Sequence, residues 1–139
     1  MTRSILIAGA LLLAAVAHAQ PGVDWDNAES VSLLMVDNRF VPDRLSLRHG
    51  VPYQLHLENH SGDLHEFTAP EFLADAIVRN PELLANEGKE IVLRPGWAVD
   101  LYLVPIGPGT FRMICADHDW DGMMGEIVVE YPLRWPSAA

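Results

Sequence analysis

The stretch Val51-Pro-Tyr53-Gln-Leu55-His-Leu57-Glu58 alternates apolar and polar side chains with a period of two. This alternation is typical of a β-strand that has one face on a hydrophobic core and the other in water. The same period returns between Trp97 and Leu103, with both of these residues in the apolar set. Turn-forming residues precede each stretch, at His49-Gly50 and at Arg94-Pro-Gly96. The two stretches therefore predict strands bounded by turns.

Other short apolar stretches separated by turn signals follow the same plan. The candidate strands cover residues 31–36, 45–47, 51–58, 91–93, 97–103, 111–115 and 127–129. About seven short strands at this spacing are typical of a β-sandwich. The sequence therefore predicts an all-β fold.

Residues 71–87 break the strand pattern. Four apolar side chains there share one helical face: Phe72, Leu73, Ala76 and Ile77. Asn80 before Pro81 is typical of an N-cap and a first helical turn, and Gly88 of a C-cap. We expect one or two short helices inserted across one side of the sandwich.

The chain has 139 residues and a formal net charge of -10, from nine Lys and Arg against nineteen Asp and Glu. This length predicts one domain. We expect no binding to nucleic acid, because neutralising phosphates requires a basic face. The single cysteine excludes an internal disulfide framework and any Cys₄-type zinc or iron–sulfur site.

Residues 1–19 have the pattern of a secretory signal peptide. Arg3 supplies the positive charge, residues 5–17 are almost wholly apolar, and Ala17-His-Ala19 forms a cleavage site. The alternative is an uncleaved anchor, although the apolar run is shorter than the ~20 residues that a membrane span needs. We therefore expect a periplasmic mature chain that begins at Gln20 and has no membrane span.

The remaining chain divides by composition. Residues 20–30 are polar and mixed, which predicts a loose N-terminal extension. The strand pattern defines one domain over residues 31–131, and residues 132–139 form a C-terminal tail.

Four side chains offer donors for a soft metal ion. Cys115, His118 and Met123 lie within nine residues, and His65 comes 50 residues before the cysteine. Strand parity points Cys115 inward, and the loop after it can bring His118 and Met123 to the same place. Two imidazoles, one thiolate and a weak axial thioether are the ligand set of a type 1 copper site. We expect one copper ion per chain.

Each of these assignments has a competitor in the sequence. His60 competes with His65, and Met124 competes with Met123. Cys115 considered alone is more often a buried core residue than a ligand. Two further histidines are expected to face solvent: His49 and His56. Trp120 either anchors the loop or belongs to a docking patch.

The sequence resembles the cupredoxins, the small blue copper proteins such as plastocyanin and pseudoazurin. The resemblance is carried by Cys-x-x-His-x-x-x-x-Met at Cys115, His118 and Met123, and by Gly122-Met-Met-Gly125 before the last strand. Further motifs in the family's order are Phe40-x-Pro42, Gly50, Leu55-x-Leu57-x-Asn59, His65 and Pro108-Gly-Thr-Phe111. The resemblance covers about residues 31–130.

This resemblance implies a Greek-key β-sandwich, here with the helical insertion, and copper ligands at His65, Cys115, His118 and Met123. One position departs from the family's pattern. Glu66 stands where plastocyanin-type proteins commonly have an Asn that ties the two ligand loops together. We expect this hydrogen bond to be altered. Asp117, Asp119 and Asp121 are expected to favour Cu(II) and to lower the reduction potential.

The function implied is that of a secreted, monomeric single-electron carrier and not of an enzyme. Its acidity predicts a redox partner with a basic surface, cytochrome-like, or a cuproenzyme. The main alternative is a periplasmic copper carrier or storage protein that delivers copper to a cuproenzyme. A domain of the multicopper oxidase or nitrite reductase type is disfavoured because the chain is short and has no His-x-His pair. A metal-free adhesion domain is disfavoured by the ligand motif.

Overall fold

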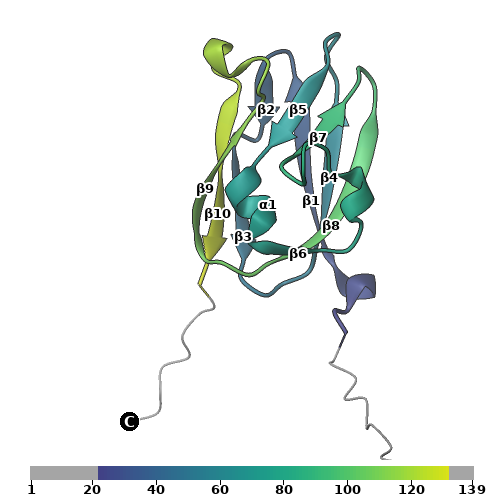
Figure 1. Ribbon diagram of the computed structural model, residues 1–139, viewed down its shortest axis with the longest axis vertical. Coiled ribbons are helices and arrows are strands. Elements are labelled where there is room, and N and C mark those ends of the chain that lie inside the picture. Colours follow the sequence, from purple (N-terminus) through teal and green to yellow (C-terminus); the bar gives the residue numbers. More distant parts are fainter. Residues whose placement is uncertain (1–21, 132–139) are drawn as a thin grey trace, which may run out of the picture.

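The computed structural model describes residues 22–131, which form two five-stranded sheets packed face to face with one short helix beside them (Figure 1). The predicted β-sandwich is therefore confirmed. The predicted signal peptide and C-terminal tail lie outside the described residues. Within the described part of the chain, no helix is long and apolar enough to cross a membrane.

The elements follow the chain in this order: η1 (Trp25–Asn27), β1 (Glu29–Val36), β2 (Arg39–Val41), β3 (Arg44–Arg48), β4 (Tyr53–Asn59), β5 (His65–Thr68), α1 (Pro70–Ala74), β6 (Ala76–Val78), η2 (Pro81–Leu83), β7 (Glu90–Leu93), β8 (Ala98–Pro105), β9 (Gly109–Ile114), η3 (Asp119–Asp121) and β10 (Met124–Glu130).

The first sheet has the strand order β2-β1-β4-β8-β6, and the second has the order β3-β10-β9-β5-β7. Two pairs are parallel, β1 with β4 and β3 with β10, while the other pairs are antiparallel. Parallel neighbours require connections that cross between the sheets, and this is the Greek-key arrangement that was expected.

The core lies between the inner faces of the two sheets. On β4, Tyr53, Leu55 and Leu57 are all buried, as the alternation predicts. The prediction for Trp97 is wrong, because this side chain is 53% exposed. It lies just before β8, where Arg94 stacks its guanidinium 5.6 Å from the indole centroid.

The helical insertion also contains a strand, β6. With β2 and β5, which were not predicted either, the described residues hold ten strands rather than about seven. After α1 the chain forms β6, which pairs with the edge of β8. Asn80 precedes η2 as expected, but its side chain does not cap that turn. The amide instead donates to the carbonyl of Asp100 (2.8 Å) and accepts from the N–H of Tyr102 (3.0 Å). Gly88 ends no helix and lies at positive φ in the turn before β7.

The first strand begins at Glu29, two residues before its predicted start. Glu29 pairs with Tyr53 of β4, and its carboxylate forms an ion pair with Arg48. Cross-strand pairing therefore extends regular structure into a polar segment that has no alternation of its own.

Candidate metal centre

Two neighbouring strands of the second sheet bring His65 and Cys115 together. His65 is the first residue of β5, and Cys115 follows the last residue of β9. These antiparallel strands pair at their last residues, Thr68 with Ile114, so His65 lies beyond the end of β9, beside the residues that follow it. The loop with η3 is at this end of the sandwich, opposite the end where the described chain begins and finishes (Figure 1).

The η3 loop folds back on itself through three backbone hydrogen bonds. The N–H of His118 donates to the carbonyl of Cys115 (3.1 Å), and that of Met123 donates to the carbonyl of His118 (3.1 Å). The N–H of Cys115 in turn donates to the carbonyl of Met123 (3.0 Å). These bonds hold the backbones of all three residues in one compact loop.

The glycines that flank the two methionines have separate structural roles. Gly122 ends η3 in the left-handed region, with φ of 86°, which a glycine adopts without steric cost. At Gly125 a Cβ atom would collide with the carbonyl oxygen of Asp43. Gly122 therefore turns the loop, and Gly125 lets β10 approach the connection between β2 and β3, where Asp43 lies.

Three donor atoms converge at the centre. The donors of His65, Cys115 and His118 all lie within 4.8 Å of one another. The Sγ atom of Cys115 is 3.6 Å from Nδ1 of His65 and 3.4 Å from Nδ1 of His118. A trigonal ion with bonds like those zinc makes to sulfur and imidazole nitrogen would hold these atoms about 3.7 Å apart. The two sulfur-to-nitrogen separations are thus already close to those that one bound ion would require.

The competing residues of the sequence occupy different environments. Met123 is fully buried at the end of the η3 loop, whereas Met124 is 41% exposed as the first residue of β10. His60 is exposed and binds Glu58 at 2.7 Å, away from the three donors. Trp120 is 78% exposed, with its indole N–H donating to the carbonyl of Asp117. His118 is the part-exposed member of the donor set.

Burial changes the ionisation of two donors. Desolvation raises the pKa of the Cys115 thiol to about 11, so the free thiol is protonated at neutral pH. Burial also lowers the pKa of His65, and the nearby His118 lowers it further. The imidazole of His65 is therefore neutral and available as a donor, while the thiol must lose a proton to bind a metal ion.

The Glu66 side chain connects the segment that carries His65 to the loop that carries His118. It therefore takes the place of the Asn hydrogen bond that plastocyanin-type proteins commonly have at this position. Its buried carboxylate accepts from the N–H of Asp117 (3.3 Å) and from the thiol of Cys115 (3.1 Å). Its backbone N–H also donates to the Cys115 sulfur (3.4 Å). The Glu66 side chain thus reaches both the cysteine and the loop that carries His118.

Asn59 is a supporting residue whose role the sequence analysis missed. It is fully buried at the end of β4, in line with Leu55 and Leu57. Its amide donates to the carbonyls of Asp63 (2.8 Å) and Leu93 (3.0 Å), and its oxygen accepts from Ser61. These bonds fix the loop that leads into His65. A polar residue at an inward-facing position of an alternating strand is the signal that could have identified it.

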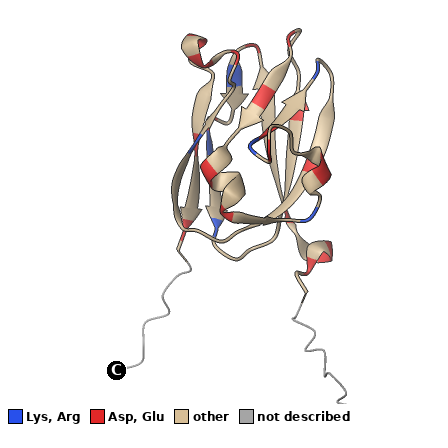
Figure 2. Ribbon diagram, viewed as in Figure 1, with Lys and Arg blue, Asp and Glu red and all other residues tan. Residues whose placement is uncertain are grey.

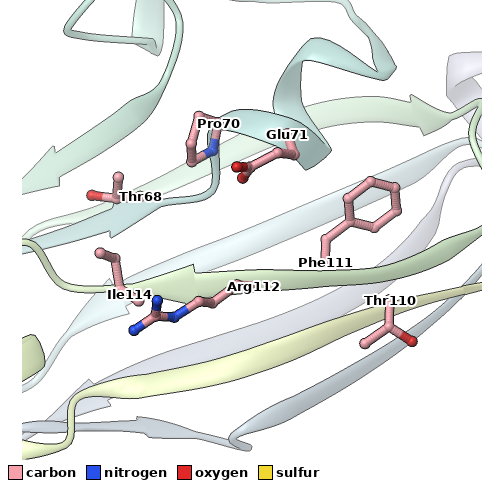
Figure 3. Close-up of a pocket in the computed structure, with 7 residues that line it drawn as sticks. All are labelled: Thr68, Pro70, Glu71, Thr110, Phe111, Arg112 and Ile114. Atoms are coloured by element: carbon pink, nitrogen blue, oxygen red, sulfur yellow. The ribbon is translucent and has the colours of Figure 1, made fainter.

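The groove between α1 and β9 is a separate feature. It has a volume of about 450 Å³, and none of the four predicted ligands lines it. Figure 3 shows Glu71 and Arg112 among the residues that line it, with Phe111 toward one end. The candidate donors are therefore not part of this groove.

The chemistry of the donor set is specific. A thiolate and two imidazoles suit soft or borderline transition metals, and the trigonal arrangement with an adjacent thioether suits copper in both of its oxidation states. Burial would keep water from an ion held by these residues, and the part-exposed His118 would be its nearest connection to the surface.

Comparisons with known proteins agree with this fold. Auracyanin B is 19% identical with a TM-score of 0.55, over 74% of this chain and 89% of that one. A dithionite-reduced auracyanin from the photosynthetic bacterium Roseiflexus castenholzii is 16% identical with a TM-score of 0.55, over 78% of this chain and 99% of that one. Curated protein sequences give no match. The family model for the cupredoxin-like domain matches residues 4–129, almost the whole sequence. The chain, with its two sheets and its Cys–His–His cluster, therefore belongs to the family of cupredoxin-like domains.

Proposed function

We propose that His65, Cys115, His118 and Met123 hold one copper ion and that the protein carries single electrons between redox partners. Copper is the cofactor that family membership and the donor set together assign to the chain. When bound, copper supplies a one-electron couple between Cu(I) and Cu(II).

The approach of both Nδ1 atoms to the buried Cys115 sulfur, at 3.6 and 3.4 Å, is the observation that carries this proposal. The donors come from β5, from the end of β9 and from the η3 loop, all held by backbone hydrogen bonds. A frame held in this way resists ligand movement when an electron arrives or leaves. Small reorganisation favours electron transfer over bond-making chemistry.

Retention of the ion also favours an electron carrier over a copper carrier. Cys115 and His65 are both fully buried; His65 begins β5 and Cys115 follows β9, and these two strands are neighbours in one sheet. Release of the ion therefore requires local opening of the sandwich. For the copper carrier, the half-exposed Met124, which follows Met123 in the sequence, offers a thioether that could pass Cu(I) to an acceptor.

We place the protein in the periplasm as a monomer, on the pattern of residues 1–19, and assign it no enzymatic activity. Its partner carries a basic surface. Acidic segments occur from η1 at one end of the sandwich to η3 at the metal end (Figure 2). Asp119 and Asp121 flank the exposed Trp120 close to His118. These groups make the metal end an acidic surface around an apolar centre.

Visible and EPR spectra of the copper-loaded protein test the site. We expect an intense thiolate-to-copper band that Cys115→Ser abolishes. Rapid reversible reduction by a reduced cytochrome, with copper retained, supports the electron carrier. Stoichiometric transfer of copper to a periplasmic acceptor, with slow electron exchange, supports the copper carrier. A colourless copper complex contradicts the proposed ligand set.

A further inference from the structure

One edge of β9 is open along most of its length. Antiparallel pairing with β10 covers the other edge from Gly109 to Ile114. On the open side, β9 pairs with β5 only at Thr68–Ile114, the last residue of each strand. The groove between α1 and β9 lies along this open side, and its lining includes Thr110 and Arg112. The groove is thus bordered by a strand edge that lacks a neighbour.

Pro70 explains why the pairing with β5 stops. Continuing the antiparallel register by two residues would place Pro70 opposite Arg112. Proline has no N–H to donate to an opposite strand, and it is tolerated in the first turn of a helix. The chain accordingly leaves the sheet at Pro70 and begins α1. The helix contacts β9 through the rings of Phe72 and Phe111, whose centroids are 5.8 Å apart. Such a side-chain contact leaves the backbone edge of β9 unpaired.

The backbone groups of Thr110 and Arg112 face this open side. The N–H of Glu126, which lies opposite Arg112 on β10, donates to the carbonyl of Asp43 on the far side of β10 (2.9 Å). Successive residues of a strand direct their N–H and C=O groups to opposite edges, so Arg112 and Glu126 form a pair without mutual hydrogen bonds. Arg112 therefore directs both groups toward α1, and Thr110, two residues earlier, does the same. Within residues 22–131, neither N–H has a hydrogen-bond partner on that side.

Two opposite charges flank the open edge. Glu71 extends from α1 and Arg112 from β9, on the two sides of the groove (Figure 3). Among the ion pairs of the described residues, none includes either side chain. The volume of about 450 Å³ is in the range of pockets that bind ligands. A fitting ligand offers donors and acceptors at the spacing of a strand, together with charges of both signs.

We infer that this groove binds an extended peptide segment of another protein, which adds a strand to the open edge of β9. The main chain of the segment accepts hydrogen bonds from the N–H groups of Thr110 and Arg112 and donates to their carbonyls. A basic side chain of the segment faces Glu71, an acidic one faces Arg112, and an apolar one contacts Phe111. In this mode of recognition the main chain provides affinity and alternate side chains provide specificity.

Amide hydrogen exchange, followed by NMR on the reduced copper-loaded protein, tests the open edge. The amides of Thr110 and Arg112 should exchange at least about tenfold faster than those of Phe111 and Met113, which bond to β10. The probe is the blocked peptide acetyl-Val-Lys-Val-Asp-Val-amide, which has the required alternation and charges. Saturation with this peptide should slow the two fast amides about tenfold and leave the two slow ones unchanged.

Variants of the chain and of the peptide test how the peptide is held. Glu71→Gln and Arg112→Gln should each weaken binding about threefold, as expected for exposed ion pairs. The matched controls are Glu82→Gln in η2 and Arg39→Gln in β2, which should bind as the unmodified chain does. Two further peptides carry N-methyl groups on alternate residues and so block one edge each. One should bind about tenfold more weakly than the parent peptide, because its hydrogen bonds to β9 are lost, and the other should bind equally well.

Equal exchange at Thr110 and Phe111 overturns the inference, and so does absence of binding by the parent peptide. Equal binding of the two methylated peptides contradicts strand addition. Protection of Thr110 and Arg112 that appears with dimerisation, before any peptide is added, assigns the edge to a second copy of this chain instead. The inference does not depend on the proposed function, because none of the four proposed copper ligands lines the groove. A missing visible band contradicts the copper site alone, and failure at the groove leaves that band unaffected.

Discussion

The Oε2 atom of Glu66 lies 3.1 Å from the Sγ atom of Cys115, and both residues are buried. The same oxygen accepts from the N–H of Asp117 in the loop that carries His118. Glu66 thus connects the two loops and also places a carboxyl group beside the Cys115 sulfur. This contact links the architecture of the site to its electrostatics.

Replacing Glu66 by glutamine should raise the reduction potential of bound copper. A carboxylate near the sulfur favours the more positive Cu(II) state, and the amide keeps the shape while removing the charge. We expect a shift of about 60 mV, which is tenfold in a one-electron equilibrium, measured by redox titration. Glu130→Gln, an exposed position at the end of β10, is the control. Equal potentials in the two variants would show that the carboxylate does not act on the metal.

Copper binding should release one proton from Cys115. The thiol has a pKa of about 11 in the folded protein, so it binds a proton throughout the neutral range and must lose it to become a ligand. The apparent affinity should therefore rise about tenfold per pH unit between pH 6.5 and 8.5, and the rise should end near the pKa. Competition with a chelator of known affinity measures this slope, and calorimetry in buffers of different ionisation enthalpy counts the proton. A flat profile contradicts the assignment of the thiol.

Met123→Leu should keep the intense colour and raise the potential. The axial thioether forms a weak, long bond that tunes the metal without holding it. Met124→Leu is the matched control, because Met124 is adjacent in sequence but half-exposed. If Met124→Leu changes the visible spectrum and Met123→Leu does not, the two methionines have been assigned in the wrong order.

Electron exchange with a basic partner should slow as salt is added. The Debye length shrinks from ~30 to ~8 Å between 0.01 and about 0.15 M ionic strength, which weakens electrostatic steering. Removing two charges at the metal end, by Asp119→Asn with Asp121→Asn, should reduce the slope of this salt dependence. Asp24→Asn with Asp26→Asn, at η1 on the opposite end, should leave it nearly unchanged. Stopped-flow mixing with a reduced basic cytochrome at several salt concentrations measures the slope for each double variant. If both double variants reduce the slope of the salt dependence equally, only the total charge matters, and docking at the metal end is contradicted.

The fold was predictable because strand alternation and turn residues act over short distances along the chain. Tyr53, Leu55 and Leu57 point inward whatever else the chain does, since their period is that of the strand. The insertion was only partly predictable. Residues 76–78 have helical spacing in the sequence, yet pairing with the edge of β8 makes them a strand. Tertiary pairing overrides a local pattern this short.

The metal centre divides in the same way. Cys115, His118 and Met123 lie in one loop that closes through its own backbone, so their spacing alone indicates that they belong together. The sequence leaves open which of His60 and His65 lies beside the cysteine, because that depends on where β4 ends and on a loop that Asn59 fixes.

Contacts between residues about 50 positions apart, such as Glu66 with Cys115, were decided only by the tertiary structure. So was the pairing of His56 with Asp100. Such contacts depend on which strands become neighbours and in which register, and that choice is made by burial of the whole core rather than by any segment of it.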